Sequence, residues 1–76
     1  MQAPEIIDAK AIPPRERHPA IFAKFDSLAP GQSFQLVNDH DPVHLFYQFQ
    51  MERPGMVGWQ KLENGPEVWR VTISRL

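Results

Sequence analysis

Proline and glycine divide this chain into short segments, and this division limits the folds it can adopt more than any other feature. The breaks fall at Pro13-Pro14, Pro30-Gly31, Asp41-Pro42, Pro54-Gly55 and Gly65-Pro66. Proline fixes φ and has no N–H to donate, so helix interiors and central strands do not run through such points. No segment approaches the length needed to span a membrane. The sequence therefore predicts one small domain built from short helices and strands.

The first half of the chain predicts a strand, a helix and a second strand. Ile6-Ile7, followed by Asp8 and Ala9, indicates a short strand. A helix is expected to begin between Pro14 and Pro19, with Pro19 in its first turn, where a missing N–H costs nothing. Its apolar stripe has helical spacing and consists of His18, Ile21, Phe22, Phe25 and Leu28. After the turn at 29–32, Ser33 to Val37 predicts the second strand.

The segment from Pro42 to Glu52 fits two patterns. Leu45, Phe46 and Phe49 form a helical face, whereas alternate residues from Leu45 to Met51 are also apolar, as in a strand. We expect a helix, because Asp41 is a suitable N-cap and Pro42 suits the first helical position.

The last part of the chain predicts a hairpin. Val57 to Leu62 and Glu67 to Ser74 indicate two strands joined by a turn at 63–66, and Trp59 and Trp69 are expected to pack in the core or across the strands rather than against a partner. The order β-α-β-α-β-β predicts an α+β fold, a two-layer sandwich with a four-stranded mixed sheet and both helices on one face.

Composition excludes several classes of function. The net charge of the 76 residues is −1, and the densest basic cluster, Arg15-Glu16-Arg17, contains an acid, so nucleic-acid binding is not expected. The chain has no cysteine, which rules out thiolate nucleophiles and cysteine metal ligands. We expect a cytoplasmic protein without membrane contact, monomeric or weakly dimeric, with a flexible tail at 1–4 and one domain at 5–76.

The landmarks of the chain resemble those of the TusA/SirA-like sulfur-carrier fold. Asp8 on the first strand, the Pro30-Gly31 turn and the Asp41-Pro42 step occur at matching spacings. The resemblance places Pro14 where those proteins carry their sulfur-bearing cysteine. Because a persulfide needs a thiol, sulfur transfer is not expected of this chain.

Four sequence blocks resemble the bacterial domain-of-unknown-function 2249 family more closely. The blocks are Pro13 to Pro19, Leu28 to Gly31, Asn38 to Pro42 and Gly65 to Val71. The resemblance implies a cytoplasmic domain of unknown activity. Members joined to hemerythrin-like domains imply a connection with iron, nitric oxide or redox physiology.

Two polar blocks are expected to meet at one edge of the sheet. In a right-handed β-α-β unit, the loops after both parallel strands lie at the same end, where open α/β sheets bind ligands. This places Arg15, Glu16, Arg17 and His18 near the second block, which consists of Asn38, Asp39, His40 and Asp41. Both helices would begin there, and their free N–H groups would favour an anion.

Each polar group also has a structural interpretation. His18 is expected to be a half-buried cap or staple residue, or else a ligand or proton donor. Asp39-His40-Asp41 can be a solvated turn, or can supply a carboxylate and a histidine that join His18 in a two-histidine-one-carboxylate metal site of the kind that holds iron. His44 is expected on the surface. Arg15 and Arg17 are expected to pair with Glu16 or the aspartates, or otherwise to bind a carboxylate or phosphate.

The sequence thus favours a non-catalytic binding or regulatory module for a small ligand or a partner protein. No catalytic constellation or nucleotide motif is visible, so an enzyme is not expected. The alternative is a protein that binds a divalent metal or haem through His18 and His40 in nitric oxide or redox physiology.

Overall fold

The computed structural model describes residues 5–76; the expected tail at 1–4 lies outside the described residues. The elements follow the predicted order, with one additional 3₁₀ turn, η1. They are β1 (Glu5–Asp8), η1 (Ala9–Ala11), α1 (Pro14–Asp26), β2 (Ser33–Asn38), α2 (Val43–Glu52), β3 (Val57–Asn64) and β4 (Trp69–Arg75). Within residues 5–76, no helix is long and apolar enough to cross a bilayer.

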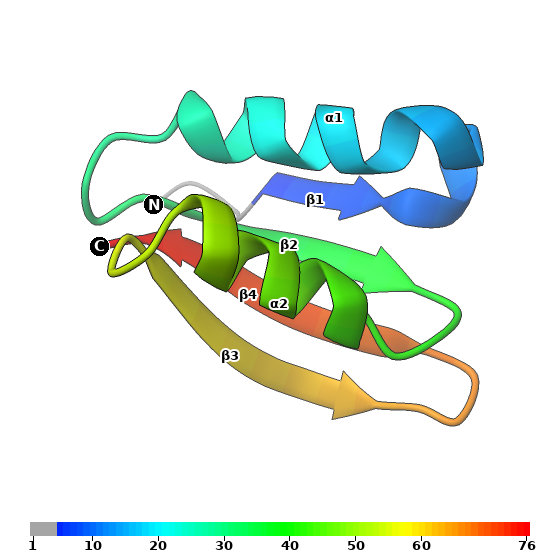
Figure 1. Ribbon diagram of the computed structural model, residues 1–76. Helices are drawn as coiled ribbons and strands as arrows, with labels where there is room; N and C mark the ends of the chain where they lie inside the picture. Colours follow the sequence, from blue (N-terminus) through cyan, green and yellow to red (C-terminus); the bar gives the residue numbers. More distant parts are fainter. Residues whose placement is uncertain (1–4) are drawn as a thin grey trace.

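The strands form one mixed sheet in the order β1-β2-β4-β3. β1 pairs with β2 in parallel, and β4 lies antiparallel to both β2 and β3. Figure 1 shows both helices on the same face of this sheet, with their first turns at the edge where β1 and β2 end. The predicted α+β two-layer architecture is confirmed, because a parallel crossover requires a helix and this chain has only enough length for one helical layer.

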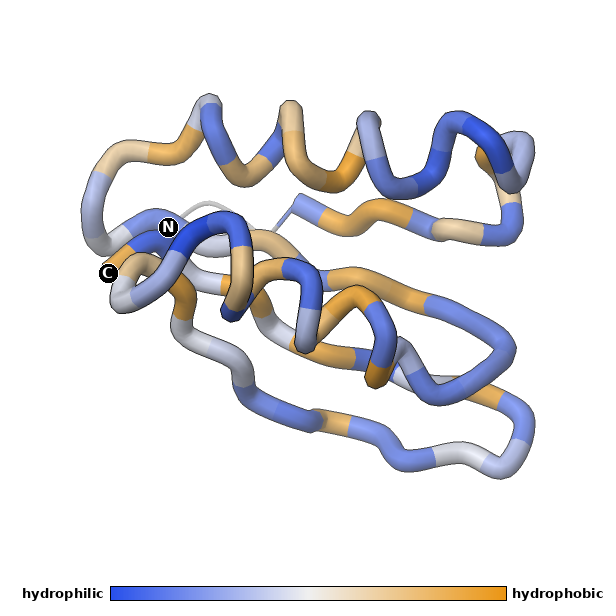
Figure 2. The backbone as a smooth tube through the Cα atoms, in the orientation of Figure 1, coloured by the Kyte–Doolittle hydropathy of each residue, from blue (hydrophilic) through white to orange (hydrophobic). Residues whose placement is uncertain are grey.

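The core lies between the sheet and the helices. Alternate residues of the central strands face the helices and are buried, among them Phe34 and Leu36 on β2 and Val71 and Ile73 on β4. On α1 the apolar positions lie on the side facing the sheet, as Figure 2 shows.

Three aromatic rings join the two helices. The ring of Phe49, which is fully buried, stacks on Phe22 of α1 at 4.2 Å between centroids and meets the edge of Phe25 at 5.2 Å. Trp59 of β3 lies on the other side of α2, 5.2 Å from Phe46 and 6.4 Å from Phe49. The expected packing role of Trp59 is therefore confirmed.

An ion pair joins the same end of the helices. Arg53, just after α2, donates two hydrogen bonds to the carboxylate of Asp26 at the end of α1, at 3.0 and 2.9 Å. These bonds lower the pKa of the Asp26 carboxyl from its usual value. The Arg53 guanidinium also lies 5.3 Å from the centre of the Phe22 ring.

The opposite face of the sheet carries no helix and is covered by polar side chains. Arg70 of β4 donates hydrogen bonds to Glu63 of β3 at 2.8 Å and to Gln35 of β2 at 3.2 Å. This cross-strand set spans three strands and keeps the open face polar.

Pro19 lies inside α1 and not in its first turn, so that expectation is wrong. The helix begins at Pro14, and Pro19 is its sixth residue. Pro19 cannot donate to the carbonyl of Arg15, and α1 therefore lacks one hydrogen bond near its N-terminus. Packing of Ile21 and Phe25 against the sheet holds the helix across this point.

Asp41 does not cap α2, which corrects a second expectation. The helix is confirmed, but its cap position is Pro42, and no side chain donates or accepts a capping hydrogen bond there. The carbonyl of Pro42 accepts the first helical bond from the N–H of Phe46 at 3.0 Å. Asp41 is displaced by one position, because Pro42 occupies the cap itself.

The ring of Phe49 should be a dominant contribution to stability. Phe49→Ala is expected to lower the free energy of unfolding by about 3–5 kcal/mol, because it removes a buried ring that contacts both helices. Urea denaturation followed by circular dichroism measures this change. Tyr47→Ala, on the exposed side of the same helix, is the matched control and should change stability by less than about 0.5 kcal/mol. Equal losses in the two variants would contradict this packing.

Asp41→Ala should leave stability nearly unchanged, within about 0.5 kcal/mol, because Asp41 makes no capping bond. A loss near 1 kcal/mol or more, which is typical of a removed N-cap, would restore the capping interpretation. The same urea experiment measures it.

Candidate functional site

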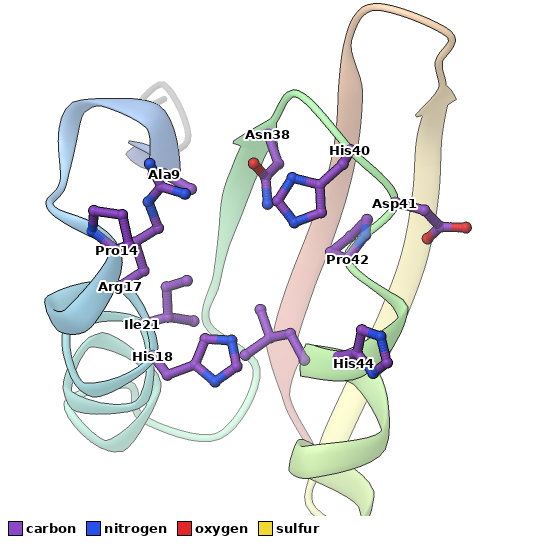
Figure 3. A pocket seen from close by; sticks show the side chains of 11 residues that line it. Ala9, Pro14, Arg17, His18, Ile21, Asn38, His40, Asp41, Pro42 and His44 are labelled. Carbon is purple, nitrogen blue, oxygen red and sulfur yellow. The ribbon is translucent and has the colours of Figure 1, made fainter.

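A cavity of about 170 Å³ opens at the edge where β1 and β2 end, between α1 and the loop that leads into α2. Figure 2 shows that hydrophilic segments gather at this edge, and Figure 3 shows the cavity from close by. Its lining residues are Ala9, Pro14, Arg17, His18, Ile21, Asn38, His40, Asp41, Pro42, His44 and Leu45.

One side of the cavity is a helical stripe of α1. Pro14, Arg17, His18 and Ile21 are spaced i, i+3, i+4 and i+7, so they lie on the same side of the helix. The Nε of Arg17 donates to the carbonyl of Ile12 at 2.8 Å. This bond holds the guanidinium at the entrance of α1 and leaves its terminal nitrogens for other partners.

The facing side is the end of β2 and the loop after it. Asn38, the last residue of β2, is only 8% exposed, and its Oδ1 accepts a hydrogen bond from the N–H of Asp39 at 2.9 Å. Figure 3 shows the ring of His40 beside Asn38 and the carboxylate of Asp41 directed away from α1. The loop therefore presents an amide and an imidazole to the cavity.

Asp39 belongs to this loop but does not line the cavity. Its Oδ1 lies 2.9 Å from the Nδ1 of His40, and this hydrogen bond lowers the pKa of the Asp39 carboxyl from its usual value. The charges of His40 and Arg17 act in the same direction. The carboxylate thus orients the imidazole of His40 from outside the cavity.

Both helices begin without a side-chain cap. The cap positions are Pro13 and Pro42, and neither helix has a capping hydrogen bond from a side chain. The first backbone N–H groups of α2, from Val43 to Leu45, therefore have no partner within the helix. Together with the helix dipoles they make this edge favourable to negative charge.

The cavity unites five of the eight expected site residues. Arg17, His18, Asn38, His40 and Asp41 line it, whereas Arg15, Glu16 and Asp39 do not. Sequence reasoning missed most of its walls, and His44, expected only on the surface, is exposed and also lines it. The i, i+3, i+4, i+7 spacing from Pro14 to Ile21 was the signal that could have identified the α1 side.

Two local expectations are wrong. His18 is the fifth residue of α1 and is exposed, so it is neither a cap nor a half-buried staple residue. Within residues 5–76, the ion pairs involve other arginines and Lys24, and not Arg15 or Arg17. Arg17 bonds a backbone carbonyl instead, because α1 begins close enough to Ile12 for its side chain to fold back.

The described part of the chain contains no group of three or more His, Cys, Asp and Glu side chains that could hold a metal ion. The expected set of His18, His40 and a carboxylate is therefore not assembled in this arrangement. Asp39 bonds His40 from the far side, which separates it from His18.

Removing the imidazole of His40 should raise the pKa of the Asp39 carboxyl toward its ordinary value, because the hydrogen bond from His40 is the largest cause of the shift. Carboxyl ¹³C chemical shifts followed against pH measure this in His40→Ala. His44→Ala is the control and should leave Asp39 unchanged. An unaltered Asp39 titration in His40→Ala would contradict the pairing.

The chain was compared with known proteins. Searches of curated proteins and of solved structures found no match, so the likeness to the TusA/SirA-like fold stays a prediction. A protein-family model described as "Uncharacterized conserved protein (DUF2249)" matches residues 6–75. The chain therefore belongs to the DUF2249 family.

Proposed function

We propose that this domain is a non-catalytic binding module that takes a small anion into the cavity between α1 and the loop after β2. The observation that carries the proposal is the lining itself. Side chains from two segments about twenty residues apart, including Arg17 and His18 on one side and Asn38 and His40 on the other, surround one space of about 170 Å³.

The charge distribution supports an anionic ligand. Arg17 is the only arginine or lysine in the lining, and its guanidinium stays charged at any physiological pH. The uncapped starts of two helices add backbone donors and positive dipole ends at the same edge. The nearby carboxylates oppose this only weakly, because Asp39 is paired with His40 and Asp41 is directed away (Figure 3).

The composition of the lining favours binding over catalysis. Among the described residues that form the cavity, there is no Ser, Thr, Cys, Lys or Tyr that could act as a nucleophile. The groups present bind and orient a ligand: an arginine, three imidazoles and an amide. We place the module in the bacterial cytoplasm as a monomer or weak dimer, in keeping with the family resemblance.

The competing proposal is a divalent metal or haem bound through His18 and His40. The observation that favours it is the presence of both imidazoles in one cavity lining, with His44 as a third. Imidazole is a common ligand for both groups.

A ¹⁵N NMR titration of untagged protein tests both proposals. Inorganic phosphate and acetate should each shift the Arg17 side chain and the amides of Val43 to Leu45, with saturation. Arg17→Gln should weaken binding at least about tenfold, since a hydrogen-bonded charge is lost. Arg15→Gln, one turn position away and outside the cavity, is the matched control and should bind normally.

Two results would change the conclusion. If neither anion shifts the cavity signals, the anion-binding module is wrong. If Zn(II), Fe(II) or haem instead shifts the His18 and His40 ring signals together, saturating at one equivalent, the metal or haem proposal replaces it.

A further inference from the structure

We infer that the cavity is built for a carboxylate carried on a short apolar body, and that Asn38 donates a hydrogen bond to a carboxylate oxygen. This inference rests on the proposed function and names the chemical class of the ligand. It depends on three properties of the cavity: a buried amide donor, an apolar wall and a single fixed positive charge.

The buried donor is the side-chain amide of Asn38. Its Oδ1 is held by the N–H of Asp39 at 2.9 Å, so the Nδ2 must point the other way, toward the cavity. Figure 3 shows the amide nitrogen on the cavity side. Within residues 5–76 no acceptor bonds this nitrogen, although Asn38 is only 8% exposed. A buried amide donor requires an acceptor, and a ligand oxygen in the cavity supplies one.

The wall beneath this donor is apolar. Ala9, Ile21 and Leu45 are 1%, 2% and 4% exposed, and each contributes to the cavity lining. Pro14 and Pro42 extend the wall on the two sides. An ion as small as inorganic phosphate would leave this surface uncovered, whereas a hydrocarbon group would bury it, and burial of apolar surface favours binding.

The charge in the cavity matches one negative charge. Arg17 is the only lining residue that carries a permanent positive charge, and its free terminal nitrogens suit the two oxygens of a carboxylate. Asp39 and Asp41 in the adjoining loop disfavour a second negative charge on the ligand. The volume of about 170 Å³ is below that of pockets for drug-sized ligands, so the apolar body must be short.

The test compares four probes on the intact protein by ¹⁵N NMR: acetate, butanoate, inorganic phosphate and 1-butanol. Butanoate should bind about tenfold more tightly than acetate, because it adds two methylene groups that reach the apolar wall. Butanoate should also bind more tightly than phosphate. 1-Butanol has the same hydrocarbon length without the charge and should not shift the Arg17 side chain.

The role of Asn38 is tested by Asn38→Asp. This variant keeps an oxygen to accept from the N–H of Asp39 but replaces the donor with a carboxylate oxygen, so butanoate affinity should fall at least about tenfold. The Asn38 side-chain amide signal of the unaltered protein gives an independent reading that needs no variant. It should shift on adding butanoate and stay in place with 1-butanol.

The outcomes separate this inference from the proposed function. If phosphate binds more tightly than butanoate, or if acetate and butanoate bind equally, the inference is wrong and the anion-binding module stands. An Asn38 amide signal that ignores butanoate would likewise overturn the inference. If no anion shifts the cavity signals, both are wrong.

Discussion

The contact of Phe49 with Phe22 and Phe25 determines how the two helices lie on the sheet. All three rings gather in the second half of α1 and in α2, and the Asp26–Arg53 pair fastens the same end of the helix layer. The exposed ion pair contributes little by itself, since such pairs are worth about 0–1 kcal/mol. The rings supply most of the stabilisation, because they remove a large apolar area from water. With the helices joined at one end, the side chains at their first turns are left with a space between them, and that space is the cavity.

The elements of the fold could be predicted because they follow from periodicity and from turn residues. The stripe containing Ile21 and Phe25 identified α1, and the parallel crossover brought the ends of β1 and β2 to one edge. The details that failed depend on single dihedral angles and rotamers. Pro42 occupies the cap position of α2 with ψ of 38°, which no residue pattern indicated. Pro19 is accepted inside α1 because tertiary packing outweighs one missing hydrogen bond.

The candidate site was predictable in location but not in membership. Topology placed the two polar blocks together, and Arg17, His18, Asn38, His40 and Asp41 do share a cavity. Membership depends on the phase of α1, which is set by its start at Pro14. That start places Arg15 and Glu16 on the outer side. The apolar walls went unrecognised because Ala9, Ile21 and Leu45 look like ordinary core residues in the sequence.

The walls of the cavity belong to two segments that meet only through the short parallel ladder of β1 and β2, four residues long. An unfolded chain, or one in which β1 has come away, has no cavity at all. Any molecule that occupies it must therefore stabilise the folded state, by about 2.7 kcal/mol at a hundred times its dissociation constant. The melting temperature of this small domain thus reports occupancy directly, and a thermal-shift screen can find ligands whose identity nobody has guessed.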